Sequence, residues 1–274
     1  MDIRQKKESL EKKLQGFENI VVAYSGGIDS SLLLKISHRL KKDKVIALIV
    51  KSPFVANFEY ENAISFCKEI GVNYKVINVN MHDLAPVKHN PEDRCYICKT
   101  LVFTEIINEA KKLGFNTIVD GSNASDTGDY RPGKKALKEL GIISPFLECD
   151  ITKDEIRIFS KEEKISFYNK PSNSCLATRI PYNNEITEQK LNQIELSEDY
   201  IRKFGINVVR LRHYDHIAII EVGRDEREKL FDIEKMDKIE EFILKLGFKF
   251  VTINIAGYKT GNLNKLINIE ENNG

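Results

Sequence analysis

Residues 19–30 read NIVVAYSGGIDS, and this stretch decides the fold. Its first half is a continuous apolar run, which is typical of a strand buried in a parallel sheet. Two glycines then let the backbone approach a ligand closely, and the helical spacing that follows would aim free N–H groups at an anion. An aspartate among these donors implies a cation such as Mg²⁺ between it and the anion. The residues expected to bind phosphate and cation are Ser25, Gly26, Gly27, Asp29 and Ser30.

A simpler interpretation of the same stretch is a glycine-rich turn in which Asp29 or Ser30 caps the helix. The flanking strand and helix favour the phosphate loop, because all of its parts occur together in the right order. A second glycine-rich stretch, residues 128–135, nearly matches a Walker A loop. It lacks the final Ser or Thr and follows no apolar strand, so we do not predict a second nucleotide site there.

Strands alternate with helices over the first two thirds of the chain. Strands are expected at residues 19–24, 45–50, 74–79 and 117–120. Helices are expected at residues 4–15, 30–40, 57–70, 101–113 and, with a capping box, 152–163. This alternation predicts an α/β fold with a doubly wound parallel sheet, which binds ligands at the carboxyl ends of its strands.

The pattern changes after residue 170. Helices are expected at residues 187–204 and 226–246, and strands at 207–213, 216–222 and 248–256. We therefore predict a smaller C-terminal α+β domain. The boundary is placed near Ile180-Pro181, which gives domains at residues 1–180 and 181–274.

Composition excludes several classes of protein. The 274 residues include 42 basic and 41 acidic side chains, so the net charge is +1 and no basic excess points to nucleic acid. No apolar run approaches the roughly 18 residues of a membrane span, and the N-terminus lacks a signal-peptide core. Five cysteines suggest no disulfide framework, and Cys67 and Cys149 are expected to be structural. We expect a cytoplasmic protein with no membrane or nucleic-acid partner.

The phosphate loop resembles the PP-loop of the ATP pyrophosphatase superfamily, whose members cleave ATP to AMP and pyrophosphate. Two further stretches resemble the LarE family of sulfur transferases, which act in nickel-pincer cofactor synthesis. One is Asp120-Gly121 followed by residues 129–133 (DYRPG), and the other is residues 171–182 (PSNSCLATRIPY). The resemblance covers nearly the whole chain.

The resemblance implies a reaction and a set of ligands. ATP would adenylate carboxylates of pyridinium-3,5-biscarboxylic acid mononucleotide, and sulfur would displace AMP to leave thiocarboxylates. Mg²⁺ would offset the charge on the departing pyrophosphate. Ser52 ends the second expected strand, where adenine docks in such sheets, and Asp120 beside Gly121 ends the fourth, where it would bind Mg²⁺ or shape the loop. Lys99 would reach the ATP phosphates or the adenylate, with a surface lysine as the alternative.

An anionic substrate needs cations. Arg210 and Arg212 alternate along an expected strand and so share one face, and Arg179 follows Cys175 by four residues. The family resemblance associates the two strand arginines with the substrate phosphate. The alternative is a solvated strand face paired with acidic residues. The resemblance also suggests a homo-oligomer, a ring-like hexamer. In it the C-terminal substrate and oligomerisation domain would lie at the subunit contacts, with Asp237 at one of them.

Three cysteines are candidates for the sulfur chemistry that the resemblance implies. By resemblance, Cys175 is the sulfur-bearing position, and in some family members a lone cysteine here surrenders its own sulfur. This chain also has Cys95 and Cys98 just before an expected helix. Three thiolates suit a [4Fe-4S] cluster with one open iron, as in a cluster-bearing branch of the family. The alternatives are structural zinc with a histidine such as His89, a dithiol redox pair, or unligated cysteines with Cys175 sacrificial.

Three other functions compete with the sulfur transferase. A tRNA thiolase would share the loop and the cluster, but it predicts a basic patch or further Cys-x-x-Cys pairs. A synthetase that forms amides from ammonia would not need the three cysteines. A nucleotide-binding regulator would show no turnover.

Overall fold

The computed structural model describes residues 2–128, 132–169, 173–259 and 261–262. The chain forms two compact units, Met1–Leu84 with Cys95–Asn173, and Ala85–Arg94 with Ser174–Gly274. The motif residues Asp129, Tyr130 and Arg131 and the pair Pro171-Ser172 lie outside the described residues.

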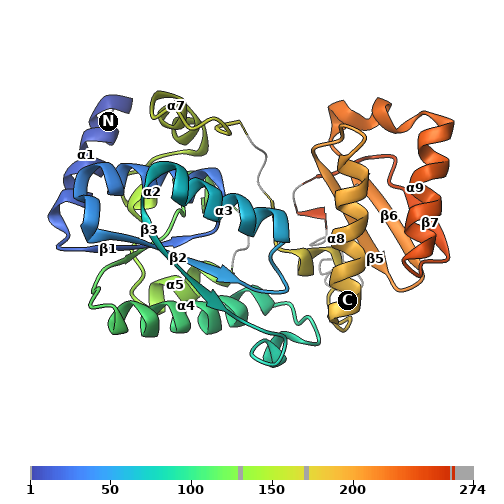
Figure 1. The fold of residues 1–274 in the computed structure, drawn as a ribbon, viewed down its shortest axis with the longest axis horizontal. Helices are drawn as coiled ribbons and strands as arrows, with labels where there is room; N and C mark the ends of the chain where they lie inside the picture. The colour runs from blue at the N-terminus through green and yellow to red at the C-terminus, as the bar shows by residue number, and fades with distance from the viewer. Residues whose placement is uncertain (1, 129–131, 170–172, 260, 263–274) are drawn as a thin grey trace, which may run out of the picture. The chain divides into compact units, whose positions relative to one another are not determined.

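The first unit is built on a parallel sheet (Figure 1). Its strands are β1 (Ile20–Tyr24), β2 (Val45–Lys51), β3 (Asn73–Asn78) and β4 (Ile118–Val119), in the order β3-β2-β1-β4. Each neighbouring pair is parallel. The α/β fold with a parallel sheet predicted from the alternation is confirmed, and it is the PP-loop fold.

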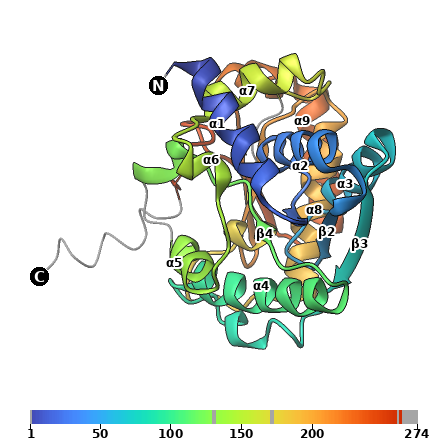
Figure 2. The ribbon, with the colours of Figure 1, turned by 90° about the vertical axis from the view of Figure 1, so that its left-hand side faces the viewer.

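Helices cover both faces of this sheet (Figures 1 and 2). One face carries α1 (Ile3–Gly16), α2 (Ile28–Lys41), α3 (Asn57–Ile70), α6 (Pro145–Glu148) and α7 (Lys153–Glu162). The other carries α4 (Arg94–Lys112) and α5 (Pro132–Glu139). In β1, Ile20 and Val22 enter the first core while Val21 enters the second, as the two-residue period of a strand requires. Burial on both faces explains why the strand sequence is continuously apolar.

Short 3-10 helices occur in both units. They are η1 (Lys42–Lys44), η2 (Ala85–Val87), η3 (Ala124–Gly128), η4 (Leu176–Arg179) and η5 (Arg224–Leu230).

The second unit contains β5 (Val209–Tyr214), β6 (Ile217–Val222) and β7 (Phe250–Ile253), in that order. The pair β5–β6 is antiparallel and the pair β6–β7 is parallel. Helix α8 (Glu188–Arg202) packs against β5, and α9 (Ile233–Lys245) packs against β7. Tyr200 of α8 stacks on Phe242 of α9 with ring centroids 4.0 Å apart.

Two expectations for this unit were wrong in extent. The single helix expected at residues 226–246 is divided into η5 and α9, because the Asp232 side chain caps α9 by accepting from the backbone N–H of Lys235. The strand expected at 248–256 is shorter at both ends.

The division between the units differs from a single boundary near Ile180-Pro181. It falls after Asn173, and the second unit also takes in Ala85–Arg94. The Asn90 side chain explains this, because its Nδ2 donates to the carbonyls of Ile180 and Pro181 at 2.9 and 2.7 Å. Among the described residues, no helix is long and apolar enough to cross a membrane.

Candidate functional site

The loop between β1 and α2 brings two hydroxyl groups together. The Oγ atoms of Ser25 and Ser30 lie 3.1 Å apart, and Ser30 also donates to the carbonyl of Gly27 at 3.1 Å. Helix α2 begins at Ile28, with Gly27 as its N-cap and no side-chain hydrogen bond at the cap. The alternative in which Asp29 or Ser30 caps this helix is therefore wrong. The amino end of α2 keeps N–H groups that suit an anion.

Two glycines in this region are required by packing. Gly26 has φ +76°, and a Cβ there would lie 3.0 Å from the carbonyl oxygen of Glu59. A Cβ on Gly121 would lie 2.9 Å from the backbone nitrogen of Ser30, so the chain leaving β4 passes directly against the start of α2. At Gly27 the nearest atom is the Oγ of Ser25 at 3.5 Å. The glycines at 26 and 121 therefore shape the loop, whereas the one at 27 leaves room beside it.

Ser52 and Asp120 follow β2 and β4, the two strands that pair with β1 in parallel. Their positions at the carboxyl ends put them at the same edge of the sheet as the loop. The two carboxylate oxygens of Asp120, a buried residue, accept from the hydroxyls of Ser122 and Ser144 at 2.5 Å each. Asp120 thus holds its own turn, and its role as a Mg²⁺ ligand stays a prediction.

Asp29 has a cationic partner that the sequence did not reveal. Its Oδ1 lies 2.5 Å from Nζ of Lys153, the first residue of α7. Burial raises the pKa of Asp29 above its ordinary value, and the Lys153 ammonium opposes that rise. The expected capping box does start α7, because Thr152 accepts from the backbone N–H of Glu155. That box marks where the helix begins, but nothing in the pattern shows where the lysine side chain goes.

The paired cysteines lie inside a helix, not before it as expected. Helix α4 begins at Arg94, so Cys95 and Cys98 are three residues apart in its first turns and share a face. A Cβ on Gly133 of α5 would lie 2.8 Å from Cδ of Lys99 and 3.4 Å from the carbonyl oxygen of Cys95. The glycine of the DYRPG stretch therefore lets α5 pack against this cysteine-bearing turn.

The cysteines fall into two groups. Cys67 and Cys149 are buried in the main core, which confirms the structural role expected for both. Burial raises the pKa of the Cys67 thiol to about 12. Cys95, Cys98 and Cys175 are half-buried, the first two in one unit and the third in the other. Within the described part of the chain, no three His, Cys, Asp or Glu side chains are arranged to hold a metal ion.

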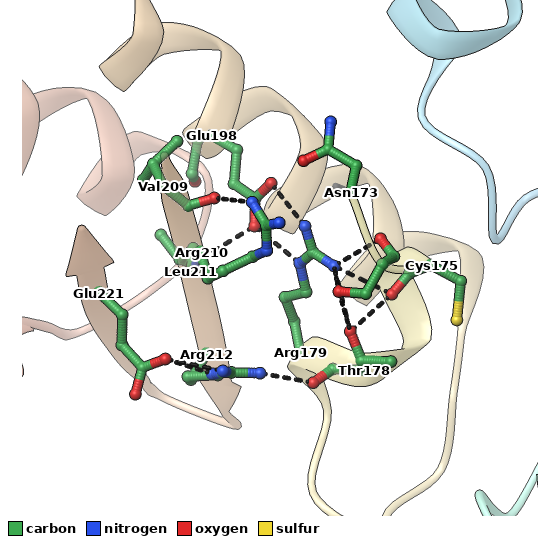
Figure 3. Close-up of polar contacts among 12 residues, drawn as sticks. Asn173, Cys175, Thr178, Arg179, Glu198, Val209, Arg210, Leu211, Arg212 and Glu221 are labelled. Atoms are coloured by element: carbon green, nitrogen blue, oxygen red, sulfur yellow. Dashed lines mark hydrogen bonds and ion pairs between the residues drawn. The ribbon is translucent and has the colours of Figure 1, made fainter. Parts of the chain in front are cut away.

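Cys175 is the N-cap of η4, and Arg179 holds this segment, residues 174–179 (the Cys175 loop), in place (Figure 3). The Nη1 of Arg179 donates to the carbonyls of Ser174 and Cys175 at 2.7 and 3.0 Å. Its Nε and Nη2 bind the two carboxylate oxygens of Glu198 at 2.8 and 3.0 Å. The Cys175 side chain points away from this guanidinium (Figure 3). Arg179 therefore fixes the backbone that presents the thiol.

Arg210 and Arg212 both lie on β5 and are buried. Arg212 donates to Glu221 Oε2 through Nη2 at 2.7 Å and to the Thr178 carbonyl through Nη1 at 2.7 Å. Arg210 donates to the carbonyl of Val209 and lies over the ring of Tyr258. Burial and the nearby charge of Arg179 lower the pKa of Arg210. The strand arginines are thus buried and do not form a solvated face, but Arg212 does pair with an acidic residue, as that alternative expected.

Two acidic residues in this network were missing from the sequence-based site. Glu198 comes from α8 and Glu221 from β6, where it lies opposite Arg210 in the strand register. Burial raises the pKa of Glu198, but the charge of Arg179 and its hydrogen bonds outweigh that effect and lower the pKa overall. No local motif marks either glutamate, because each meets its arginine only through the fold.

Known families and proteins match both the N-terminal part of this chain and nearly its whole length. Residues 3–100 match the NAD synthase family. An uncharacterised protein of Synechocystis sp. is 32% identical over 97% of this chain and 99% of its own, and one of Methanocaldococcus jannaschii is 34% identical over 93% and 96%. The pyridinium-3,5-bisthiocarboxylic acid mononucleotide synthase of Lactiplantibacillus plantarum is 30% identical over 94% of each chain. This chain belongs to the LarE family.

The LarE-family assignment covers both units, since the match to the synthase runs over 260 residues. It agrees with the PP-loop fold of the first unit and with the resemblance found in residues 171–182. The LarE-family protein is therefore an ATP-using PP-loop enzyme.

Proposed function

We propose that this LarE-family protein is a sulfur transferase of nickel-pincer nucleotide synthesis. It adenylates carboxylates of pyridinium-3,5-biscarboxylic acid mononucleotide with ATP and converts them to thiocarboxylates. One combination of observations carries the proposal. The chain is related along its length to a pyridinium-3,5-bisthiocarboxylic acid mononucleotide synthase, and the loop before α2 requires glycine at position 26. In addition, the half-buried Cys175 lies on a segment whose backbone Arg179 holds by hydrogen bonds.

In the adenylation step, a carboxylate oxygen of the substrate forms a bond to the α-phosphorus of ATP. The bond from that phosphorus to the bridging oxygen breaks, and pyrophosphate leaves with the electron pair. The N–H groups at the start of α2 and the hydroxyls of Ser25 and Ser30 bind the leaving pyrophosphate. Mg²⁺ held by Asp29 would offset its charge. Ser52 would lie at the adenine and Lys99 at the phosphates.

In the transfer step, a sulfur nucleophile bonds to the acyl carbon, and AMP leaves with its oxygen and the electron pair. If Cys175 supplies its own sulfur, its thiol first loses its proton and forms a thioester. Cleavage of the cysteine Cβ–S bond, with loss of the Cα proton, then leaves a thiocarboxylate and a dehydroalanine. The Arg179 contacts keep the Cys175 backbone fixed during this step.

The paired cysteines favour a route that spares the protein. A [4Fe-4S] cluster on Cys95, Cys98 and Cys175 would supply an open iron for an extra sulfide. The donor chemistry fits in part, because Cys95 and Cys98 share one face of α4, while Cys175 belongs to the other unit. Zinc with His89 is the competing ligand set, and a colourless zinc protein would favour it.

The substrate phosphate is assigned to the arginine network. Arg210 and Arg212 lie on one face of β5, and Arg179 is joined to them through Glu198 and the Thr178 region. Guanidinium groups suit phosphate and carboxylate because their donors form a planar fork. A homo-oligomer with Asp237 at the contact belongs to this proposal. Asp237 is exposed on α9.

The proposal is tested by incubating anaerobically purified protein with ATP, Mg²⁺ and the dicarboxylated pyridinium nucleotide. We expect pyrophosphate release and a substrate mass gain of one sulfur for one oxygen. Cys175→Ala should lose the thiocarboxylate while pyrophosphate release persists. Unchanged product in that variant would remove Cys175 from the reaction. An amide product with added ammonia would instead indicate the synthetase, and thiolation of tRNA would indicate the thiolase.

A further inference from the structure

Asn173 is the last residue of the first unit, and its side chain is bonded inside that unit. Its Nδ2 donates to Oε1 of Glu59, a residue of the first turn of α3. Glu59 is only 8% exposed, although it carries a carboxylate. Asn173 itself is exposed, and its amide forms a charge-assisted hydrogen bond to this buried carboxylate.

Glu59 lies directly beside the phosphate loop. Its carbonyl oxygen is the atom 3.0 Å from where a Cβ on Gly26 would lie, and Ala63, one turn further along α3, is 3.1 Å from the same point. The carboxylate of Glu59 is also close to the end of β1, because its charge adds to burial in raising the pKa of Tyr24. The bond to Glu59 therefore ties Asn173 to the loop that would hold the pyrophosphate.

Chain connectivity also limits how far the Cys175 thiol can lie from Asn173. Cys175 follows Asn173 by two residues, so their Cα atoms lie within about 7 Å of each other for any arrangement of the two units. From Ser174 onward the backbone is held differently, by hydrogen bonds from Arg179 to the carbonyls of Ser174 and Cys175. Asn173 is thus bonded within the first unit by Glu59, and Ser174, the next residue, is bonded within the second unit by Arg179.

We propose that the Glu59–Asn173 hydrogen bond is a positioning contact that holds the Cys175 loop at the phosphate loop for sulfur transfer. It rests on the proposed function and takes no part in adenylation, because neither side chain belongs to the loop or to the strand ends that meet the nucleotide. Without this hydrogen bond the Cys175 thiol is no longer held at the acyl-adenylate, and water hydrolyses the acyl-adenylate instead. A misplacement of about 1 Å lowers such a step by up to about 100-fold.

The test separates adenylation from transfer by measuring pyrophosphate released and thiocarboxylate formed in the same reaction. In Asn173→Asp the new carboxylate faces Glu59, and like charges repel. We expect pyrophosphate release within about twofold of the wild type and thiocarboxylate per pyrophosphate lowered about tenfold or more. Asn173→Ala removes the donor without adding charge, and its yield of thiocarboxylate per pyrophosphate should also fall.

Rescue by a second substitution distinguishes positioning from general damage. In the double variant Glu59→Gln with Asn173→Asp, the glutamine amide donates to the aspartate, so the hydrogen bond is restored with its direction reversed. The ratio of product to pyrophosphate should return to within about threefold of the wild type, a difference of less than about 0.7 kcal/mol. Asn116→Asp is the matched control, because it adds the same charge at an exposed site just before β4, at the amino ends of the parallel strands, whereas the phosphate loop follows the carboxyl end of β1.

The outcomes separate this proposal from the function on which it rests. An unchanged ratio in both Asn173→Asp and Asn173→Ala, or no recovery in the double variant, would overturn the positioning role and leave the sulfur transferase standing. A wild-type protein that releases no pyrophosphate with the dicarboxylated nucleotide would overturn both. Equal losses of pyrophosphate and product in the single variants would place the contact in adenylation and also overturn the proposal.

Discussion

Arg179 donates through Nε and Nη2 to both carboxylate oxygens of Glu198, and each of these two side chains is 1% exposed. Glu198 also accepts from the backbone N–H of Leu211 and from Arg202, at 3.0 Å each. The pair therefore joins the Cys175 loop, helix α8 and strand β5. A bidentate pair in this position has its geometry fixed from several elements at once.

Removal of Glu198 should destabilise the protein strongly. In Glu198→Ala the Arg179 charge remains buried without its counter-ion, and breaking a buried pair in this way costs about 3–5 kcal/mol. Urea denaturation followed by circular dichroism measures the loss. Glu188→Gln, an exposed acid at the start of the same helix, is the control and should change the unfolding free energy by less than about 0.5 kcal/mol. Equal stability of Glu198→Ala and this control would show that the pair contributes nothing to folding.

The two adjacent glycines of the loop should respond differently to alanine. Gly26→Ala places a Cβ 3.0 Å from the Glu59 carbonyl at φ +76°, so we expect a loss of about 1–3 kcal/mol in unfolding free energy. Gly27 has φ −77° and its nearest atom is 3.5 Å away, so Gly27→Ala should be close to neutral for stability. Thermal unfolding of both variants checks this, and a Gly27→Ala variant as unstable as Gly26→Ala would contradict it.

The ion pair between Lys153 and Asp29 predicts a pH effect. Burial raises the pKa of Asp29, and Lys153 counteracts that rise. Removing the ammonium in Lys153→Met should raise this pKa further, so the carboxylate that would bind Mg²⁺ is protonated at a higher pH. The acid limb of the pH profile for pyrophosphate release should therefore move to higher pH. Lys153→Arg keeps the charge and should leave the limb in place. An unmoved limb in Lys153→Met would show that Asp29 does not titrate in the reaction.

Strand β1 could be predicted from the sequence, because both of its faces are buried and its consecutive residues are therefore apolar. Ile20, Val21 and Val22 are all apolar since both faces of β1 are covered, and that run is visible in the sequence. The loop after β1 could be placed for the same reason. Helix α9 was harder, because η5 continues the helical pattern and only the Asp232 cap separates the two.

The partners within the site could not be predicted, because they are distant in the chain. Lys153 is 124 positions from Asp29, and no periodicity links them. The alternation of Arg210 and Arg212 predicted a shared face correctly, but the glutamate that pairs with Arg212 comes from β6 through the strand register. The sequence located the cations and left open whether they face substrate or protein.

The final prediction concerns which metal the protein contains when Cys95, Cys98 and Cys175 act as its ligands. If Cys95, Cys98 and Cys175 hold a [4Fe-4S] cluster, anaerobically purified protein should be brown, with about four irons per chain. Replacing any one of the three by serine should remove most of the iron. Cys67→Ala is the control, because this thiol is buried in the core and burial raises its pKa, which disfavours the thiolate that binds metal. Iron retained fully in Cys175→Ser would exclude Cys175 as a cluster ligand. Zinc in a colourless wild-type protein would contradict the cluster and favour structural zinc on the cysteines with a histidine such as His89.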